Sequence, residues 1–252
     1  MKKVLLIITS LFGLALTINA TKFVNLTPMP KHITVAEGAY KLPESYSINA
    51  KHLPDSICVE AEKFVQTILK TTGCKARITS KKKADIEMSL DTNLPNEGYK
   101  LSVTKKKIQI SASTTSGFFY AFQTIKKIMP VHVMAGLNPE QAQAIIPTFQ
   151  TDKRPTIPCV EIYDEPRFWY RGFMLDCGRH FFTVDEIKHI LDGMAMYKMN
   201  YFHWHLTEDQ GWRFEVKKYP RLTSIGSVAS DCRMNDMEKG YYWLGKPYGP
   251  FY

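Results

Sequence analysis

The chain has 252 residues, of which 44% are hydrophobic and 12% aromatic, and this composition excludes an intrinsically disordered chain. The formal net charge is +9, with lysines clustered at Lys81–Lys83 and Lys105–Lys107. Such clusters are typical of solvated turns between strands and leave an anionic partner as the alternative. The sequence has no basic helix and no nucleic-acid motif, so we expect no nucleic-acid partner.

Residues 1–20 have the pattern of a secretory signal peptide. Lys2 and Lys3 precede an almost unbroken apolar run from Val4 to Leu16, and Ala20 offers a small residue for cleavage. The run is shorter than the roughly 20 residues that a membrane-spanning helix needs. We therefore expect a secreted or periplasmic protein that makes no membrane contact once the signal is removed.

The chain has five cysteines, an odd number whose spacing matches no zinc motif. In an oxidising compartment, Cys58 and Cys74 are one candidate disulfide pair. Buried free thiols are the other interpretation, because a domain of this size does not need a disulfide to be stable.

Residues 21–150 are predicted to form a mixed α+β domain, in which strands alternate with Pro, Gly and charged turns. Short strands are expected at Ile33–Val35, Tyr46–Asn49, Ala76–Thr79 and Ile86–Leu90, and a hairpin at Glu97–Ala112. Apolar residues recur at helical spacing in Val59–Thr71 and Ser116–Ile128, which indicates two amphipathic helices. We expect a sheet covered by these helices on one face, with a structural role.

A proline-rich join at Gln150–Pro166 places the domain boundary near residue 150, and residues 151–252 are predicted to begin a barrel. Phe168–Asp176 is apolar on both faces, as expected for a buried parallel strand. Thr183 and Glu186 have the spacing of a capping box at a helix start, and Asn200–Leu206 is the next strand. This order predicts a right-handed parallel crossover, the first βα units of a (β/α)8 barrel.

Active sites of such barrels lie at the carboxyl ends of the strands. Asp176 ends the first barrel strand, and Arg179 and His180 follow it in the loop. Arg171 lies near the start of the same strand, so we interpret it as structural. A guanidinium held by carboxylates suits bidentate hydrogen bonds to neighbouring sugar hydroxyls, which makes Arg179 the strongest candidate for ligand contact.

The second barrel strand places His203 and His205 on one face, with Glu208 and Asp209 just beyond it. Buried imidazoles need hydrogen-bond partners, and these carboxylates can supply them. Three interpretations remain open: a structural hydrogen-bond network, a polar floor for a hydroxyl-rich ligand, and a metal site that uses His203, His205 and Glu208. The chain offers no further ligand nearby, so we predict no metal.

Two long segments resemble the opening of the catalytic barrel of glycoside hydrolase family 20, the β-N-acetylhexosaminidases. They are Arg171-Gly-Phe-Met-Leu-Asp-Cys-Gly-Arg-His180 and Tyr197-Lys-Met-Asn-Tyr-Phe-His-Trp-His-Leu-Thr-Glu-Asp-Gln-Gly-Trp-Arg213. The preceding domain, with its Ser116-Gly-Phe-Phe-Tyr-Ala-Phe-Gln-Thr-Ile helix, is similar to the small α+β domain of that family. The resemblance covers most of the chain after residue 20.

The resemblance implies an exo-acting, retaining enzyme that removes terminal N-acetylglucosamine or N-acetylgalactosamine from glycans or chitooligosaccharides, without a cofactor. In this family the substrate's own acetamido oxygen attacks the anomeric carbon. By the same resemblance, Arg179 binds the 3- and 4-hydroxyls of the sugar and Glu208 is a carboxylate of the supporting network. Asp176, His180, His203, His205 and Asp209 are expected to support them.

The sequence departs from the family in one respect. The family's catalytic Asp-Glu pair stands in a His-x-Gly-Gly-Asp-Glu type sequence, and none occurs among these 252 residues. Asp164-Glu165 precedes the first barrel strand and is no substitute. We therefore expect an N-terminal fragment or truncated product of such an enzyme, with about two of its βα units and no activity alone. A non-catalytic carbohydrate-binding or interaction protein is the alternative.

Overall fold

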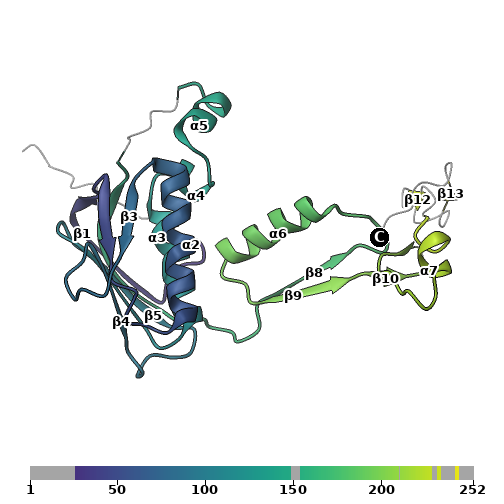
Figure 1. Cartoon of the computed structure of the whole chain (residues 1–252), viewed down its shortest axis with the longest axis horizontal. Helices are drawn as coiled ribbons and strands as arrows, with labels where there is room; N and C mark the ends of the chain where they lie inside the picture. The colour runs from purple at the N-terminus through teal and green to yellow at the C-terminus, as the bar shows by residue number, and fades with distance from the viewer. Residues whose placement is uncertain (1–25, 149–153, 210, 229–231, 234–241, 244–252) are drawn as a thin grey trace, which may run out of the picture. The chain divides into compact units, whose positions relative to one another are not determined.

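The computed structural model describes residues 26–148, 154–209, 211–228, 232–233 and 242–243 (Figure 1). The chain divides into two compact units, Met1–Glu165 and Pro166–Tyr252. In the described residues, no helix has the length and apolar character needed to cross a membrane. The predicted signal peptide at residues 1–20 lies outside them.

The first unit contains a seven-stranded mixed sheet in the order β1-β7-β5-β6-β4-β2-β3. Strand pairs from β1 to β6 are antiparallel, and those from β6 to β3 are parallel. The expected strands and hairpin are all present. Their bounds are β1 His32–Lys41, β2 Ser45–Ile48, β3 Lys75–Ile78, β4 Ile86–Leu90, β5 Tyr99–Val103, β6 Ile108–Ala112 and β7 Thr156–Asp164.

Helices α2 (Asp55–Thr72) and α3 (Thr115–Ile128) supply the apolar layer of this unit. Helix α2 ends at Gly73, whose φ of 76° is the left-handed C-cap conformation that glycine adopts without steric cost. The Phe64 and Phe122 rings stack across the two helices with centroids 4.6 Å apart. Two short helices that the sequence analysis did not predict follow, α4 (Val131–Met134) and α5 (Pro139–Ile145).

The division between the units falls after Glu165, later than the boundary near residue 150 that the prolines suggested. Strand β7 explains the difference, because it is hydrogen-bonded to β1 on one side and to β5 on the other. Its residues Ile157, Val160 and Ile162 are buried in the core of the first unit. A strand paired on both sides belongs to that sheet, so the barrel portion begins only after it.

The second unit contains the predicted parallel strand–helix–strand arrangement. Strands β8 (Gly172–Asp176) and β9 (Tyr201–His205) pair in parallel with Asp176 opposite His205. Helix α6 (Val184–Met196) joins them and begins with the expected capping box between Thr183 and Glu186. The remaining elements are β10 Thr207–Glu208, β11 Gly211–Trp212, α7 Arg221–Ser224, β12 Cys232–Arg233 and β13 Tyr242–Trp243.

Strand β8 starts at Gly172 rather than at Phe168. The Arg171 side chain explains where it starts, since Nε donates to the carbonyl of Lys198 at 2.7 Å and Nη1 to that of Phe168 at 2.7 Å. These bonds tie the Arg171 side chain to the backbone before β8 and before β9, which is compatible with a structural role. Four cysteines are free thiols (Cys58, Cys74, Cys159 and Cys177), so Cys58 and Cys74 form no disulfide.

Candidate functional site

The turn after β8 is organised by the carboxylate of Asp176. Its Oδ1 accepts hydrogen bonds from the backbone N–H groups of Gly178 at 3.0 Å and Arg179 at 3.2 Å. Burial raises the pKa of Asp176, but the hydrogen bonds from the backbone and side chain of Arg179 outweigh it, so the net pKa is lowered. Asp176 therefore stays charged and fixes where Arg179 leaves the strand.

The guanidinium of Arg179 connects two carboxylates. Its Nη1 lies 2.7 Å from Oδ2 of Asp176 and 3.0 Å from Oε2 of Glu208. The hydrogen bond that Arg179 donates to Asp176 and the charges of both carboxylates raise the pKa of Arg179. The side chain is still 49% exposed. Among the described residues no partner is recorded for Nε or Nη2, so these two donors remain open to a ligand.

Glu208 reaches Arg179 from the short β10–β11 hairpin, in which Glu208 pairs with Gly211. The approach depends on Gly178, because a Cβ atom there would lie 2.7 Å from the Cβ of Glu208. His205 supports the same carboxylate, with Nε2 3.2 Å from Oε2 of Glu208 and 3.0 Å from the carbonyl oxygen of Thr207. That carbonyl can only accept, so Nε2 carries the hydrogen.

Arg213 is a buried residue whose contribution the sequence reasoning missed. Its side chain is 6% exposed and donates to three carbonyls, those of Cys177 at 3.0 Å, Ser227 at 2.6 Å and Gly178 at 3.2 Å. It thereby holds the backbone directly before Arg179. Gly211 makes room for it, because a Cβ there would lie 2.3 Å from Nη2 of Arg213. Arg213 stands two residues after Gly211 in a largely polar and charged stretch, so the sequence offered no local signal that it would be buried.

The other predicted site residues lie around this cluster without the same contacts. The backbone N–H of Asp209 donates to Oε1 of Glu208 at 3.3 Å. The His203 ring is nearly parallel to that of His205, at 9° and 6.4 Å between centroids. His180 instead packs edge-on against Phe182 at 4.8 Å. The structure thus joins four of the predicted residues by polar contacts: two ion pairs connect Asp176, Arg179 and Glu208, and Nε2 of His205 contacts Glu208.

The opposite face of β9 packs toward α6, as the alternation predicted. Phe202 and Leu206 contact the small core formed by Leu175, Cys177 and Ile187. In the described ranges, no group of three or more His, Cys, Asp or Glu side chains is arranged as a metal site. His205 is directed to a carbonyl and a carboxylate, so the cluster is a hydrogen-bonded arginine–carboxylate arrangement.

The fold and the cluster together define a class of protein. Its members have a small α+β domain followed by the first strands of a barrel, with an arginine–carboxylate site after the first barrel strand. Sequence models of glycosyl hydrolase family 20 match both parts, domain 2 of the family at residues 24–165 and its catalytic domain at residues 168–245. The chain therefore belongs to glycosyl hydrolase family 20.

Curated relatives of this chain are beta-hexosaminidases. The chain is 37% identical to a beta-hexosaminidase of Porphyromonas gingivalis, over 83% of this chain and 26% of the relative. It is 32% identical to a beta-hexosaminidase of Vibrio furnissii, over 90% of this chain and 33% of the relative. The chain thus spans between about a quarter and a third of the length of these two relatives.

Solved structures agree with the fold. The exo β-N-acetylglucosaminidase of Vibrio harveyi, in complex with N-acetylglucosamine, matches with a TM-score of 0.70 and 30% identity, over 89% of this chain and 32% of that one. The Streptomyces plicatus N-acetyl-β-hexosaminidase, in complex with Thio-NAglucal, matches with a TM-score of 0.70 and 27% identity, over 81% and 39%. The described strand–helix–strand unit is the start of the family's TIM barrel.

Proposed function

We propose that this chain contributes the sugar-binding side of a β-N-acetylhexosaminidase active site, and that Arg179 contacts the terminal N-acetylhexosamine. The observation that carries the proposal is the geometry of the guanidinium. Nη1 is held by Asp176 and Glu208, while Nε and Nη2 of this half-exposed side chain have no partner among the described residues. Two adjacent donors of fixed geometry suit two neighbouring hydroxyls of a sugar ring.

The surrounding residues orient this donor pair. Asp176 and Glu208 keep Arg179 charged and fixed, and His205 supports Glu208 from β9. A positioned donor loses less conformational entropy when a ligand arrives. The neighbours named above, which bind N-acetylglucosamine and Thio-NAglucal in their solved structures, support this choice of ligand.

The reaction we propose for the family site is exo-acting, retaining and substrate-assisted. The acetamido oxygen of the substrate bonds to the anomeric carbon as the glycosidic bond breaks, and a general acid gives its proton to the leaving oxygen. Water then opens the cyclic intermediate and returns a proton to the same residue. The Asp-Glu sequence that would supply these carboxylates does not occur among the 252 residues, so these residues alone should bind but not hydrolyse.

The test measures binding and turnover separately on residues 21–252. We expect no release of p-nitrophenol from its N-acetyl-β-glucosaminide above the buffer blank. We also expect saturable binding of N-acetylglucosamine that Arg179→Ala abolishes and that Arg221→Ala, on an exposed arginine of α7, leaves unchanged. Turnover that persists through purification and disappears in Arg179→Ala would overturn the proposal that this chain is inactive. Binding that is insensitive to Arg179→Ala would overturn the role of Arg179.

A further inference from the structure

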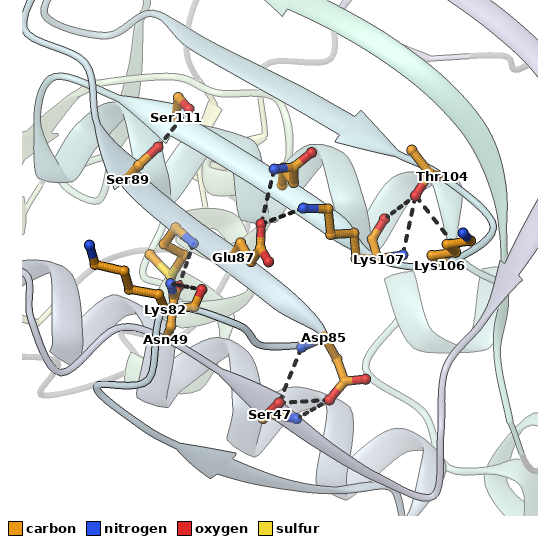
Figure 2. A network of polar contacts seen from close by, with 12 residues as sticks. Ser47, Asn49, Lys82, Asp85, Glu87, Ser89, Thr104, Lys106, Lys107 and Ser111 are labelled. Carbon is orange, nitrogen blue, oxygen red and sulfur yellow. Dashed lines mark hydrogen bonds and ion pairs between the residues drawn. The ribbon is translucent and has the colours of Figure 1, made fainter.

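The face of the first unit's sheet that the helices do not cover is polar, whereas the other face belongs to the apolar core. Side chains on alternate positions of the central strands point away from α2 and α3 and are polar. They pair across strands, as in the hydroxyls of Ser89 and Ser111 at 2.9 Å and the contact of Gln109 with Glu87 at 3.0 Å (Figure 2). This face is the open surface of the sheet.

A loop of three consecutive lysines crosses this open face. Ile78 at the end of β3 and Ile86 at the start of β4 both pair with Ile48 of β2, so the segment between them must cross β2. It is fixed at both ends. Asn49 donates through Nδ2 to the carbonyl of Lys82 at 3.3 Å, and Oδ2 of Asp85 accepts from the backbone N–H and the hydroxyl of Ser47 at 2.8 and 2.7 Å (Figure 2).

Because Ser47 alternates with the buried Tyr46 and Ile48, these contacts place the loop on the helix-free side. The edge strand β3 carries two further exposed cations, which pair with Ser45 and Ser47 of β2 and so lie on the same helix-free side. Together with the lysines of the loop they form what we call the basic corner, and all five residues are exposed: Lys75, Arg77, Lys81, Lys82 and Lys83. The backbone contacts keep the corner's lysine loop in one position.

Some lysines elsewhere on this unit are paired with acids, whereas those of the basic corner are not. Lys100 pairs with Asp91 at 3.2 Å and Lys107 with Glu87 at 2.7 Å. Within the part of the chain that the structure describes, no ion pair joins any basic-corner residue to an acid. The nearby carboxylate of Asp85 is occupied by Ser47, and Glu44, which precedes β2, makes no ion pair with the corner.

We propose that the basic corner binds a polyanionic glycan, a sulfated hexosamine-containing chain of the type represented by heparin fragments. Five exposed cations that make no ion pair within the described residues, three of them on a loop fixed at both ends, match a polymer with closely spaced negative groups. The corner has no aromatic side chain on which a nucleic-acid base could stack and no exposed apolar residue to enter a bilayer. The choice of a glycan among polyanions rests on the proposed function, whereas the site itself does not involve Arg179.

The experiment titrates residues 21–252 with a heparin hexasaccharide at several salt concentrations. Lys81→Gln/Lys83→Gln removes two charges from the basic corner. Lys105→Gln/Lys106→Gln removes two from the exposed β5–β6 turn and is the matched control. Each cation that contacts a polyanion steepens the dependence of log K on log salt by about 0.9, on the scale known for duplex nucleic acid.

We expect the corner variant to bind roughly tenfold more weakly and to lower the salt slope by about 2, while the control changes affinity no more than about twofold. Equal losses in the two variants would overturn the proposal, because binding would then follow net charge alone. The proposal is also overturned if single-stranded DNA or phosphatidylserine vesicles bind more tightly than the heparin hexasaccharide at equal charge concentration. Arg179→Ala should leave heparin binding unchanged, so failure of the sugar site and failure of the basic corner are separable.

Discussion

Replacing Arg213 by methionine should loosen the turn that carries Arg179. Methionine keeps much of the apolar volume but removes every donor, so the carbonyls of Cys177, Gly178 and Ser227 lose their side-chain partner. Leaving a buried acceptor unsatisfied costs about 1–3 kcal/mol. Taking about 1 kcal/mol for each carbonyl, the lower end of this range, gives a local destabilisation of about 3 kcal/mol.

The assay is amide hydrogen exchange read residue by residue. The N–H of Cys177 bonds to the His205 carbonyl and that of Trp212 to the Gly226 carbonyl, so both report directly on the turn. A loss of about 3 kcal/mol corresponds to exchange roughly 100-fold faster. Arg221→Met on an exposed arginine is the control, and amides of β5 are an internal reference. Unchanged protection at Cys177 and Trp212 in the Arg213 variant would refute the reasoning.

Three other predictions concern stability and the approach to the site. Phe118→Ala, at a fully buried ring of α3, should lower the unfolding free energy of the first unit, measured by urea denaturation, by about 3–5 kcal/mol. Phe119→Ala, at the half-buried neighbour, should lower it clearly less. Equal losses in the two variants would contradict the packing. Gly178→Ala should push Glu208 away through its 2.7 Å Cβ contact and weaken N-acetylglucosamine binding; unchanged affinity would contradict this contact. The lowered pKa of Asp176 means that its stabilisation is present above the unfolded pKa of about 3.9 and lost as pH falls through the lower folded value. Asp176→Asn should therefore flatten the acid end of the stability profile, and an identical profile would contradict the assignment.

The sequence predicted the elements of both units well where local signals were strong. The capping box at Thr183 and the parallel pairing of β8 with β9 followed from residue spacing and chain order. Alternation along β9 correctly separated Phe202 from His203 and His205. These features depend on neighbouring residues or on the short crossover, which is why sequence reasoning reached them.

Long-range pairing was harder to predict. Strand β7 lies between β1 and β5, far away in the sequence, and the prolines around it suggested that this strand-like segment belongs to the join between the domains. In the second unit, Val184 and Leu191 of α6 have helical spacing with the buried Ile187 but are 65% and 40% exposed. Strand order and the extent of covering layers are properties of the folded chain and leave little local signal.

At the site, residue types identified Asp176, Arg179 and Glu208, but not the way they are held. The contact between Gly178 and Glu208 and the three carbonyl bonds of Arg213 depend on backbone approach in space. A glycine in sequence is compatible with many roles, and only its neighbours in the fold show which one applies. His180 was expected among the supporting residues, and the structure places its ring against Phe182.

The most direct test of sugar binding by Arg179 is an NMR titration with N-acetylglucosamine. The protein is residues 21–252, with its arginines labelled with ¹⁵N. The Nε–H group of Arg179 is one of the open donors of the cluster. We predict a saturable shift of its resonance, with the Nε–H signals of Arg213 and Arg221 much less affected. A resonance of Arg179 that stays in place while the sugar binds elsewhere would contradict the proposal that this residue contacts the sugar.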